Sequence, residues 1–487
     1  MKKTTKSPSA AKSKDDGQKN LGLFSLTALV VGSVIGSGVF NMMNVMAESA
    51  GLMGILLGWL VTGIGMTFLV LTFRNLNKKK PKLEAGIYSY ASAGFGRFMG
   101  FSSAWGYWIS AWIGNVAYAT MAFSALSYFF SIFTDGDTSG QNLASIIGAS
   151  VVLWVGQILI MRGVKSASVM NAIVTVAKLL PIAIFIMAAF IAFKLNIFTM
   201  DIWGSADLGT LFEQMKGTML VTVWAFIGIE GAVIFSGRAK KRADVAKASF
   251  LGLYTVLAVY ILVTVLSLGV MAQPELAGVS TPGMAAVLES IVGEWGAILV
   301  NIGVIVSILG AWLAWTLFAI ELPYRAAKDG TFPAIFAKTN SKGTPIVALT
   351  VTNLLIQAFL FTFLVSDSAY NFTYSLATST ILVPYLLTAL YQLKISIQEK
   401  QGTKGRGFNI FVGVMATVYG GWLIYASGLD YLLLTSLVYG AGVVVYVLTR
   451  IFMGKKPLTM PELVIAAVFV IAAIYAIQQL ATGAISI

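Results

Sequence analysis

The chain has 487 residues, of which 57% are hydrophobic and 11% charged, and its formal net charge is +13. A soluble domain carries about 25% charged residues, so this composition excludes an ordinary water-soluble protein. The sequence contains neither Cys nor His, which excludes disulfides, thiolate or imidazole metal sites, and Cys or His nucleophiles. We therefore expect a membrane protein that is not an enzyme and has no metal and no cofactor.

Apolar runs of about 18 to 25 residues recur along the chain, and this length crosses about 30 Å of hydrocarbon as a helix. Strand-like alternation is not the pattern. The predicted fold class is thus an all-α membrane protein with about 12–13 transmembrane helices. The predicted spans are 21–43, 50–73, 98–125, 145–161, 167–193, 213–236, 248–271, 286–320, 346–364, 369–393, 407–427, 430–449 and 459–482.

Lys and Arg are distributed unevenly between the two sides of these spans. Of the 33 basic residues, all except Lys178, Lys194 and Lys216 fall in the N-terminal tail or in every second loop. Because basic loops stay in the cytoplasm, the pattern predicts a multi-pass membrane protein with a cytoplasmic N-terminus. The positive charge then reflects topology and contact with the lipid bilayer, not nucleic acid. Residues 1–20 are polar and Lys-rich, and we expect a disordered cytoplasmic tail.

Glycines interrupt two of the predicted spans at matching places. The first span contains GSVIGSGVF at 32–40, and the sixth contains AFIGIEGAVIFSG at 225–237. Glycine inside a helix costs about 1 kcal/mol relative to alanine, although in membrane helices it also permits close packing. Interruptions five spans apart favour inverted repeats whose broken helices meet at the bilayer midplane. We expect one transmembrane domain, with repeats at 21–193 and 213–393 and additional helices at 407–482.

Unwound helix segments expose free peptide groups inside the membrane. An amino-acid substrate needs N–H donors for its carboxylate and carbonyl acceptors for its ammonium group, and a break supplies both. Ser37 and Gly38 in the first break are the candidates for the carboxylate. The carbonyls of Val34 and of residues 225–228, which include Gly228, are the candidates for the ammonium group.

Four segments carry a family resemblance that runs in order over nearly the whole chain. They are VGSVIGSGVF (31–40), GYWISAWIGNVAY (106–118), VWAFIGIEGA (223–232) and AWTLFAIELPYRAAKDGTFPAIF (314–336). These segments resemble the basic amino acid/polyamine antiporters of the amino acid–polyamine–organocation superfamily, and look most like bacterial arginine–ornithine antiporters. The resemblance implies a LeuT-like fold of two inverted five-helix repeats in which helices 1 and 6 are broken. It also implies a central site between the first, third, sixth, eighth and tenth spans.

The resemblance also implies roles for single residues. Ser37 and Gly38 match the positions that bind the substrate carboxylate. Asn115 matches a polar residue that faces the substrate side chain, and the carbonyl of Ala111 contributes nearby.

Three aromatic residues match family positions around the substrate. Trp224 matches a residue that closes over it, Trp315 one on which a guanidinium or alkylammonium group lies, and Tyr107 an outer gating aromatic. A desolvated cation over an indole face gains about 2 kcal/mol, so aromatic rings can hold a cationic side chain without a carboxylate. Trp is also common at membrane interfaces and in packing.

Glu230 is a carboxylate in the middle of the sixth span, beside the glycine break. Such a group is costly there unless it has a partner, a proton or a functional task. Three interpretations remain open: it pairs with the substrate's cationic end, it acts as a protonation or gating switch, or it hydrogen-bonds backbone freed by the break.

Two further charged residues are candidates for function. Lys178 lies deep in the fifth span, where related superfamily members carry a lysine in place of the sodium ion of sodium-coupled relatives; the alternative is a side chain that snorkels to the interface. Glu321 lies near the cytoplasmic end of the eighth span, where a gate or a helix-terminal residue is expected.

These features predict a secondary transporter that exchanges a cationic amino acid for its product, most simply arginine for ornithine, by alternating access. The alternatives are agmatine/putrescine, lysine/cadaverine or histidine/histamine exchange, or proton-coupled amino-acid symport. A membrane receptor on the same scaffold, a channel and an intramembrane enzyme are disfavoured. The expected partners are the small-molecule substrate and the lipid bilayer, and a homodimer is left open.

Overall fold

The structure is a computed structural model that describes residues 22–81, 83, 86–135, 138–162, 167–230, 240–364 and 369–485. The tail predicted at 1–20 lies outside the described residues. The one sheet in the described part is a two-residue antiparallel pair, in which β1 (Thr134–Asp135) pairs with β2 (Thr138–Ser139). The rest of the ordered secondary structure is helical, as predicted.

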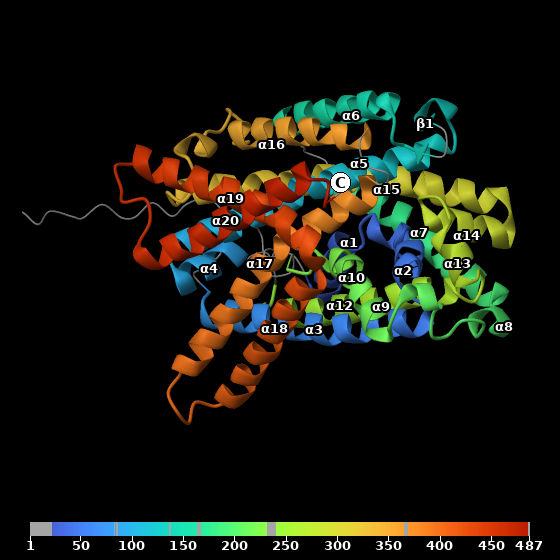
Figure 1. Cartoon of the computed structure of the whole chain (residues 1–487), viewed down its shortest axis with the longest axis horizontal. Helices are drawn as coiled ribbons and strands as arrows, with labels where there is room; N and C mark the ends of the chain where they lie inside the picture. The colour runs from blue at the N-terminus through green and yellow to red at the C-terminus, as the bar shows by residue number, and fades with distance from the viewer. Residues whose placement is uncertain are drawn as a thin grey trace, which may run out of the picture.

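The helices follow the chain in the order shown in Figure 1. They are α1 (Leu23–Val34), α2 (Met42–Ser49), α3 (Leu52–Lys79), α4 (Ile87–Phe95), α5 (Arg97–Ser127), α6 (Leu143–Arg162), α7 (Ala167–Ala192), α8 (Leu195–Phe198), α9 (Leu211–Gly217), α10 (Met219–Phe226), α12 (Arg242–Ser267), α13 (Gln273–Ala277), α14 (Gly283–Val292), α15 (Glu294–Lys328), α16 (Ile346–Phe359), α17 (Ala369–Gln398), α18 (Arg406–Ala426), α19 (Gly428–Phe452) and α20 (Met460–Ala481). Short 3₁₀ turns occupy Gly38–Phe40, Ser131–Phe133, Ala206–Leu208, Ala334–Ala337 and Leu360–Leu364.

Ten helices of the described part are long and apolar enough to cross a membrane. They include α20, so the thirteenth predicted run has the length and composition of a membrane span. The predicted boundary of the eighth span at residue 286 is wrong, because α14 ends at Val292 and α15 begins at Glu294. Gly293 separates them with φ +83°, a left-handed conformation that glycine adopts without a Cβ clash.

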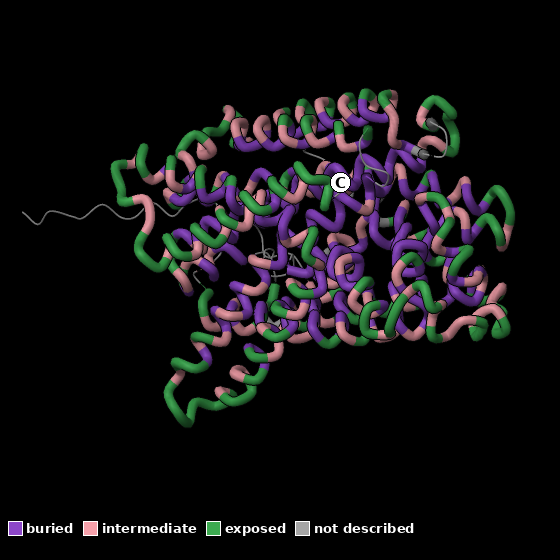
Figure 2. The backbone as a smooth tube through the Cα atoms, in the orientation of Figure 1, coloured by how far each residue is buried: buried purple, intermediate pink, exposed green. Residues whose placement is uncertain are grey.

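The centre of the bundle is α5, which packs between α15 and α17. Every residue of α5 from Phe98 to Ala125 except Met99 is buried. Buried residues fill the middle of the molecule, and exposed residues lie along its periphery (Figure 2). The outer face of α20 is apolar and exposed, as at Leu463, Val468 and Ile471, which suits a helix that contacts lipid.

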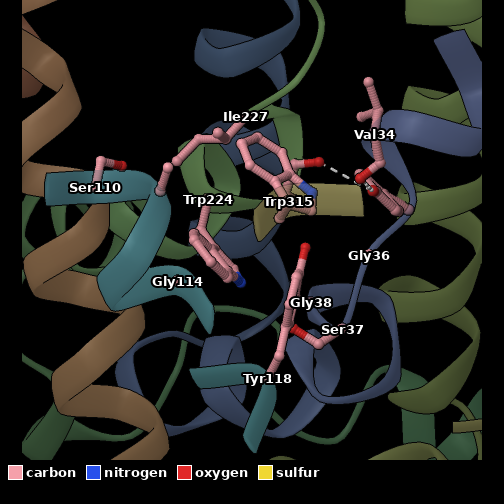
Figure 3. A pocket seen from close by; sticks show the side chains of 13 residues that line it. Val34, Gly36, Ser37, Gly38, Ser110, Gly114, Tyr118, Trp224, Ile227 and Trp315 are labelled. Carbon is pink, nitrogen blue, oxygen red and sulfur yellow. Dashed lines mark hydrogen bonds between the residues drawn. The ribbon is translucent and has the colours of Figure 1, made fainter. Parts of the chain in front are cut away.

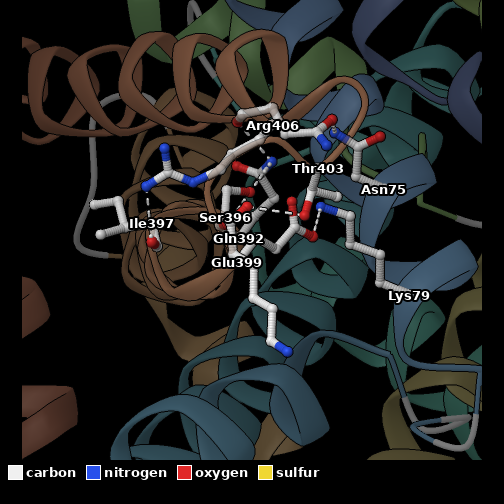
Figure 4. A network of polar contacts seen from close by, with 10 residues as sticks. Asn75, Lys79, Gln392, Ser396, Ile397, Glu399, Thr403 and Arg406 are labelled. Atoms are coloured by element: carbon white, nitrogen blue, oxygen red, sulfur yellow. Dashed lines mark hydrogen bonds and ion pairs between the residues drawn. The ribbon is translucent and has the colours of Figure 1, made fainter.

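One end of the bundle carries a polar network that joins α3 to the hairpin of α17 and α18 (Figure 4). Lys79 forms an ion pair with Glu399, and Asn75 Nδ2 donates to Asn409 Oδ1 at 3.1 Å. Arg406 Nη2 donates to the carbonyl of Ile397 at 3.1 Å. The tip of this hairpin extends past the neighbouring helices (Figure 1). The network therefore marks the basic end of the molecule, which the charge distribution predicts to be cytoplasmic.

Candidate functional site

The first predicted break is present. Helix α1 ends at Val34, residues 35–37 are not helical, and a 3₁₀ turn over Gly38–Phe40 leads into α2. A Cβ atom on Gly36 would lie 2.8 Å from Tyr118 Oη, and one on Gly38 would lie 3.2 Å from Trp224 Cδ1. Both glycines thus allow α5 and α10 to approach the exposed peptide groups closely.

The second break lies beside the first. Helix α10 ends at Phe226, and residues 227–230 form a turn. Gly228 has φ +104°, and a Cβ on it would lie 3.1 Å from the carbonyl oxygen of Ser33. This backbone conformation requires glycine, and the near approach brings the two breaks together. Gly231, the other glycine named in this segment, lies outside the described residues.

Tyr260 of α12 joins the two breaks and was not among the predicted site residues. Its hydroxyl lies 2.9 Å from the carbonyl oxygen of Ala225 and 3.2 Å from that of Val34, and it donates to both. One hydroxyl proton serves one carbonyl at a time. The carbonyls predicted to receive the substrate ammonium group therefore share one protein donor, and at any moment one of them receives no hydrogen bond from Tyr260. A Tyr inside the apolar run GLYTVLAVYILV was the available signal, because a buried hydroxyl needs a partner.

A narrow pocket lies between the breaks, with a cavity volume of about 20 Å³ (Figure 3). It contains six of the predicted substrate residues, and the labelled side chains in Figure 3 surround one space. Its lining consists of Val34, Gly36, Ser37, Gly38, Ser110, Ala111, Gly114, Tyr118, Trp224, Ala225, Ile227, Tyr260 and Trp315. Gly228 adjoins it, since a Cβ there would lie 3.4 Å from Trp315 Cζ2.

The pocket offers an open hydroxyl at its floor. The Ser37 side chain is 1% exposed, and no group meets hydrogen-bond geometry with its oxygen, although the Tyr370 side chain lies close by. A buried hydroxyl without a partner is costly, so a ligand that bonds it is favoured.

Aromatic rings enclose the pocket on the side of α17. The ring centroids of Trp224 and Tyr118 are 6.1 Å apart, and those of Trp224 and Tyr374 are 6.3 Å apart. Tyr374 in turn lies 5.3 Å from Tyr370. Trp224 is thus held in a cluster of aromatic contacts beside the first break, while Trp315 approaches from α15.

Asn115 is buried on α5, one turn after Ala111, but it does not line the pocket. Its Nδ2 donates to Thr316 Oγ1 of α15 at 3.1 Å, and its Oδ1 has no partner. Its proposed contact with the substrate side chain stays a prediction.

Glu230 lies in a closed hydrogen-bond network. Tyr107 donates to Glu230 Oε1 at 2.5 Å, and Tyr385 donates to Oε2 at 3.1 Å. The backbone N–H of Gly228 also donates to Oε2, at 3.3 Å. Glu230 does not line the pocket. Its bonds link the second break to α5 and α17, which favours the gating and backbone-bonding interpretations over direct pairing with substrate.

The position of Tyr107 differs from the outer gate that the resemblance implies. Tyr107 precedes Ala111 by one turn, about 6 Å closer to Arg97 and the basic end of α5. The Tyr107–Glu230–Tyr385 network therefore lies between the pocket and the basic end. The sequence already contained this signal, because the charge pattern places Arg97 at the cytoplasmic end of the third predicted span and Tyr107 in the cytoplasmic half of that span.

Lys178 of α7 reaches the first break. Its Nζ donates to the carbonyl of Ile35 at 2.9 Å and also to the carbonyl of Gly32. The side chain is 3% exposed, so it does not snorkel. Lys178 thus bonds carbonyls at the end of α1 and at the start of the unwound segment, where helical partners run out.

Glu321 is separate from the pocket. It pairs with Arg325, one turn later on α15, at 2.6 Å, and both side chains are nearly half exposed. An exposed pair of this spacing contributes little to stability. Within the described ranges, no three carboxylates gather in a way that would hold a metal ion.

Comparison with known proteins extends this picture. The sequence pattern of the amino acid permease family matches residues 21–477. The chain is 46% identical to the arginine/ornithine antiporter of Pseudomonas aeruginosa over 97% of this chain and 99% of that protein. It is 43% identical to the arginine/ornithine antiporter of Latilactobacillus sakei over 96% of this chain and 98% of that protein. It is 41% identical to the arginine/agmatine antiporter of Chlamydia abortus over 94% of this chain and 96% of that protein.

A solved structure shows the same fold. The substrate-bound, outward-open state of a Na⁺-coupled sialic acid symporter matches with a TM-score of 0.50 and 14% sequence identity, over 85% of this chain and 90% of that chain. The predicted fold class, with inverted repeats and broken helices 1 and 6, is confirmed. Together, the two helix breaks, the pocket between them and the full-length matches show that the chain is a multi-pass membrane transporter of the amino acid permease family.

Proposed function

We propose that the protein exchanges arginine for ornithine across the bacterial cytoplasmic membrane, with its N-terminus in the cytoplasm. The observation that carries this proposal is a pocket between two helix breaks whose lining, among the described residues, has open peptide groups and two indoles but no charged side chain. Relatives named arginine/ornithine antiporter, alike over nearly their whole length, support the choice of substrates.

The two ends of an amino acid fit the two breaks. The substrate carboxylate takes the N–H groups of the 36–38 segment and the open Ser37 hydroxyl, near the positive end of the helix dipole that begins there. The ammonium group takes whichever carbonyl, of Val34 or Ala225, Tyr260 leaves free. Backbone dipoles thus hold a zwitterion without a fixed charge, which limits the cost of an empty site in the membrane.

The side chain of the substrate lies between α5 and α15. Trp224 and Trp315 offer aromatic faces to a guanidinium or an alkylammonium group, and the carbonyl of Ala111 is close to the same space. A cation over an indole gains about 0.5–2 kcal/mol. Because both arginine and ornithine present a cation at the end of an aliphatic stem, one surface accepts either.

Different groups of side chains close the pocket on its two sides, as alternating access requires. The Tyr107–Glu230–Tyr385 network closes the basic, cytoplasmic side, and Trp224 with Tyr374 covers the outer side. Inward opening requires that the bonds of Glu230 break as one repeat, 21–193 or 213–393, rocks against the other. Lys178 takes the place of a coupling ion, so transport proceeds without sodium.

The test is exchange in proteoliposomes. Vesicles loaded with ornithine are expected to take up labelled external arginine much faster than empty vesicles, with no need for sodium or a pH gradient. Equal uptake by empty vesicles contradicts exchange, and uptake that requires a pH gradient without internal substrate identifies a symporter.

Agmatine is a second candidate for the exported amine, because similar relatives are named arginine/agmatine antiporter. Agmatine has no carboxylate and leaves the Ser37 hydroxyl without a partner. Loading the same vesicles with agmatine decides between the two: faster arginine uptake than with ornithine favours the agmatine exchanger.

A further inference from the structure

An apolar groove lies between α3 and α12, on the outer surface of the bundle and apart from the substrate pocket. It extends along residues 56–68 of α3 and 254–261 of α12, with a cavity volume of about 550 Å³. Leu60, Ile64 and Tyr254 line it, and each is about half exposed. The two helices pack side by side (Figure 1). In a protein that crosses a membrane, an open apolar surface of this kind faces the lipid chains.

The two helices of the groove are antiparallel, and two contacts fix their register. Trp59 Nε1 donates to Thr264 Oγ1 at 2.9 Å, and the hydroxyl oxygens of Thr67 and Tyr254 are 3.1 Å apart. Residue numbers therefore rise along α3 and fall along α12 in the same direction, which leads to the basic end of the molecule.

Two basic side chains lie at that end of the groove. Arg74 follows Thr67 by two helical turns, and Lys247 precedes Tyr254 by two turns. Both therefore lie on the faces that form the groove, level with each other and about 10 Å beyond the two hydroxyls. Both are exposed, and within the described ranges neither forms an ion pair. The first turn of α12 holds one acidic residue, Asp244, so the two cations leave a positive charge here.

The length and the charge of the groove fit one phospholipid. Leu56 and Phe68 are 12 residues apart, which makes the groove about 18 Å long at 1.5 Å per residue. One leaflet contributes about half of the roughly 30 Å of hydrocarbon, so the groove matches the depth that one acyl chain occupies. A phosphate at the end of this chain lies where Arg74 and Lys247 converge, and both side chains are common phosphate ligands.

A second copy of the chain fits the groove less well. Two copies with the same orientation in the membrane are related by an axis along the membrane normal, so their basic ends lie at the same level. Contact through this groove brings Arg74 and Lys247 of one copy toward the same residues of the other. Like charges brought together at an interface are costly, so the charge favours an anionic lipid.

We propose that the groove binds an anionic phospholipid of the leaflet at the basic end, with one acyl chain between α3 and α12 and its phosphate on Arg74 and Lys247. The hydroxyls of Thr67 and Tyr254 bond each other, so the acyl chain meets an apolar surface. Because α3 and α12 belong to different predicted repeats, the bound lipid stabilises the described arrangement of the two. This inference does not depend on which substrates are exchanged.

The first test measures lipid binding to the purified full-length protein by native mass spectrometry, with phosphatidylglycerol and zwitterionic phosphatidylethanolamine as probes. In the double variant Arg74→Gln with Lys247→Gln, we expect the affinity for phosphatidylglycerol to fall about 30-fold, or about fivefold for each basic side chain. The affinity for phosphatidylethanolamine should change less than twofold. The matched control is Lys400→Gln with Lys404→Gln, which removes the same charge from exposed residues between α17 and α18 and should bind like the wild type.

The second test fills the groove and leaves its charges in place. Ile64→Trp puts a larger ring at an exposed position of the groove, so binding of both lipids should weaken. Leu463→Trp, at a similarly exposed apolar residue of α20, is the control and should bind both lipids like the wild type. Melting temperatures without lipid show that each variant is folded. Added phosphatidylglycerol should raise the melting temperature of the wild type and of both controls, but raise that of the Arg74, Lys247 double variant much less.

Four results overturn the proposal. The first is equal affinity of the wild type for the two lipids, and the second is equal loss of phosphatidylglycerol binding in the Arg74, Lys247 variant and its control. The third is stabilisation by glycerol 3-phosphate as large as that by phosphatidylglycerol, which indicates a site for free phosphate. The fourth is a dimer that Ile64→Trp converts to a monomer, which makes the groove a subunit interface. Failure of arginine/ornithine exchange in proteoliposomes changes none of these binding results.

Discussion

The hydroxyl of Tyr260 lies 2.9 Å from the carbonyl oxygen of Ala225, and the same hydroxyl reaches the carbonyl of Val34 at the end of α1. A single side chain on α12 thus touches both broken helices. Since these helices belong to the two predicted repeats, Tyr260 couples the exposed backbone of one to that of the other.

Tyr260→Phe removes this coupling and leaves the ring in place. We expect exchange to slow about tenfold, because the two carbonyls lose the one hydroxyl proton that they share inside the membrane. Tyr254→Phe is the matched control, since Tyr254 is on the same helix but half exposed. Initial rates of arginine uptake into ornithine-loaded vesicles provide the measurement. Equal rates for the two variants contradict a role for the Tyr260 hydroxyl.

Trp315→Ala should weaken arginine binding about 2- to 30-fold, the loss of about 0.5–2 kcal/mol from a cation over an indole. Trp315→Phe keeps an aromatic face, so its affinity for arginine should lie between that of the wild type and that of Trp315→Ala. Trp295, which is half exposed at the start of α15, serves as the control position. Citrulline, which has a neutral side chain, should bind the wild-type protein weakly and be insensitive to Trp315→Ala. Equal sensitivity of arginine and citrulline means that Trp315 contributes packing alone.

Lys178→Met should destabilise the protein, because the carbonyls of Gly32 and Ile35 lose a donor at about 1–3 kcal/mol each. We expect a lower melting temperature in detergent and loss of exchange. Sodium at high concentration should recover part of the stability of this variant and none in the wild type. Lys194→Met, at an exposed lysine, is the control. A variant that melts like the wild type contradicts the proposed role of the ammonium group.

Glu48 is expected to make uptake from outside depend on pH. Its carboxylate accepts a hydrogen bond from Asn371 at 3.2 Å and acts electrostatically on Tyr374, which contacts Trp224. Part of the residue faces solvent, but burial of the carboxyl group raises the pKa of Glu48 to about 7, and the Asn371 bond opposes this rise. The group is thus neutral below about pH 7 and negative above it.

A negative Glu48 attracts a cationic substrate, so the apparent affinity for external arginine should be higher at pH 8 than at pH 6, by about three- to tenfold. Glu48→Gln should abolish this difference and resemble the low-pH wild type. Glu275→Gln, at another exposed acidic residue, should retain it. The test is the apparent affinity for external arginine at the two pH values. An unchanged pH dependence in Glu48→Gln excludes this carboxylate as its source.

Local sequence chemistry predicted the fold and the two helix breaks that flank the pocket. Gly36, Gly38 and Gly228 identified both breaks because a helix interior disfavours glycine. Matching motifs then brought Trp224 and Trp315 to one pocket, where the structure also places them.

The rest of the site depends on how helices pack, which no single segment reveals. In the sequence, Tyr260 looks like an ordinary aromatic residue in an apolar run, because its hydrogen-bond partners lie on other helices. Asn115 is turned toward Thr316 by the rotation of α5 against α15. The placement of Tyr107 nearer the basic end, by contrast, follows from the charge pattern, because Arg97 directly precedes the third predicted span.

The absence of any charged residue from the lining of the substrate pocket, in the described part of the chain, has an electrical consequence. Under the proposed exchange, the pocket lining adds no charge to that of the cargo, and arginine and ornithine both carry a net +1 at neutral pH. A membrane potential of 100 mV biases one such charge by about 2.3 kcal/mol, which favours the inward step of one cargo and opposes the outward step of the other equally. A one-for-one swap of these two amino acids would therefore move no net cargo charge, whereas export of a doubly charged decarboxylated amine would.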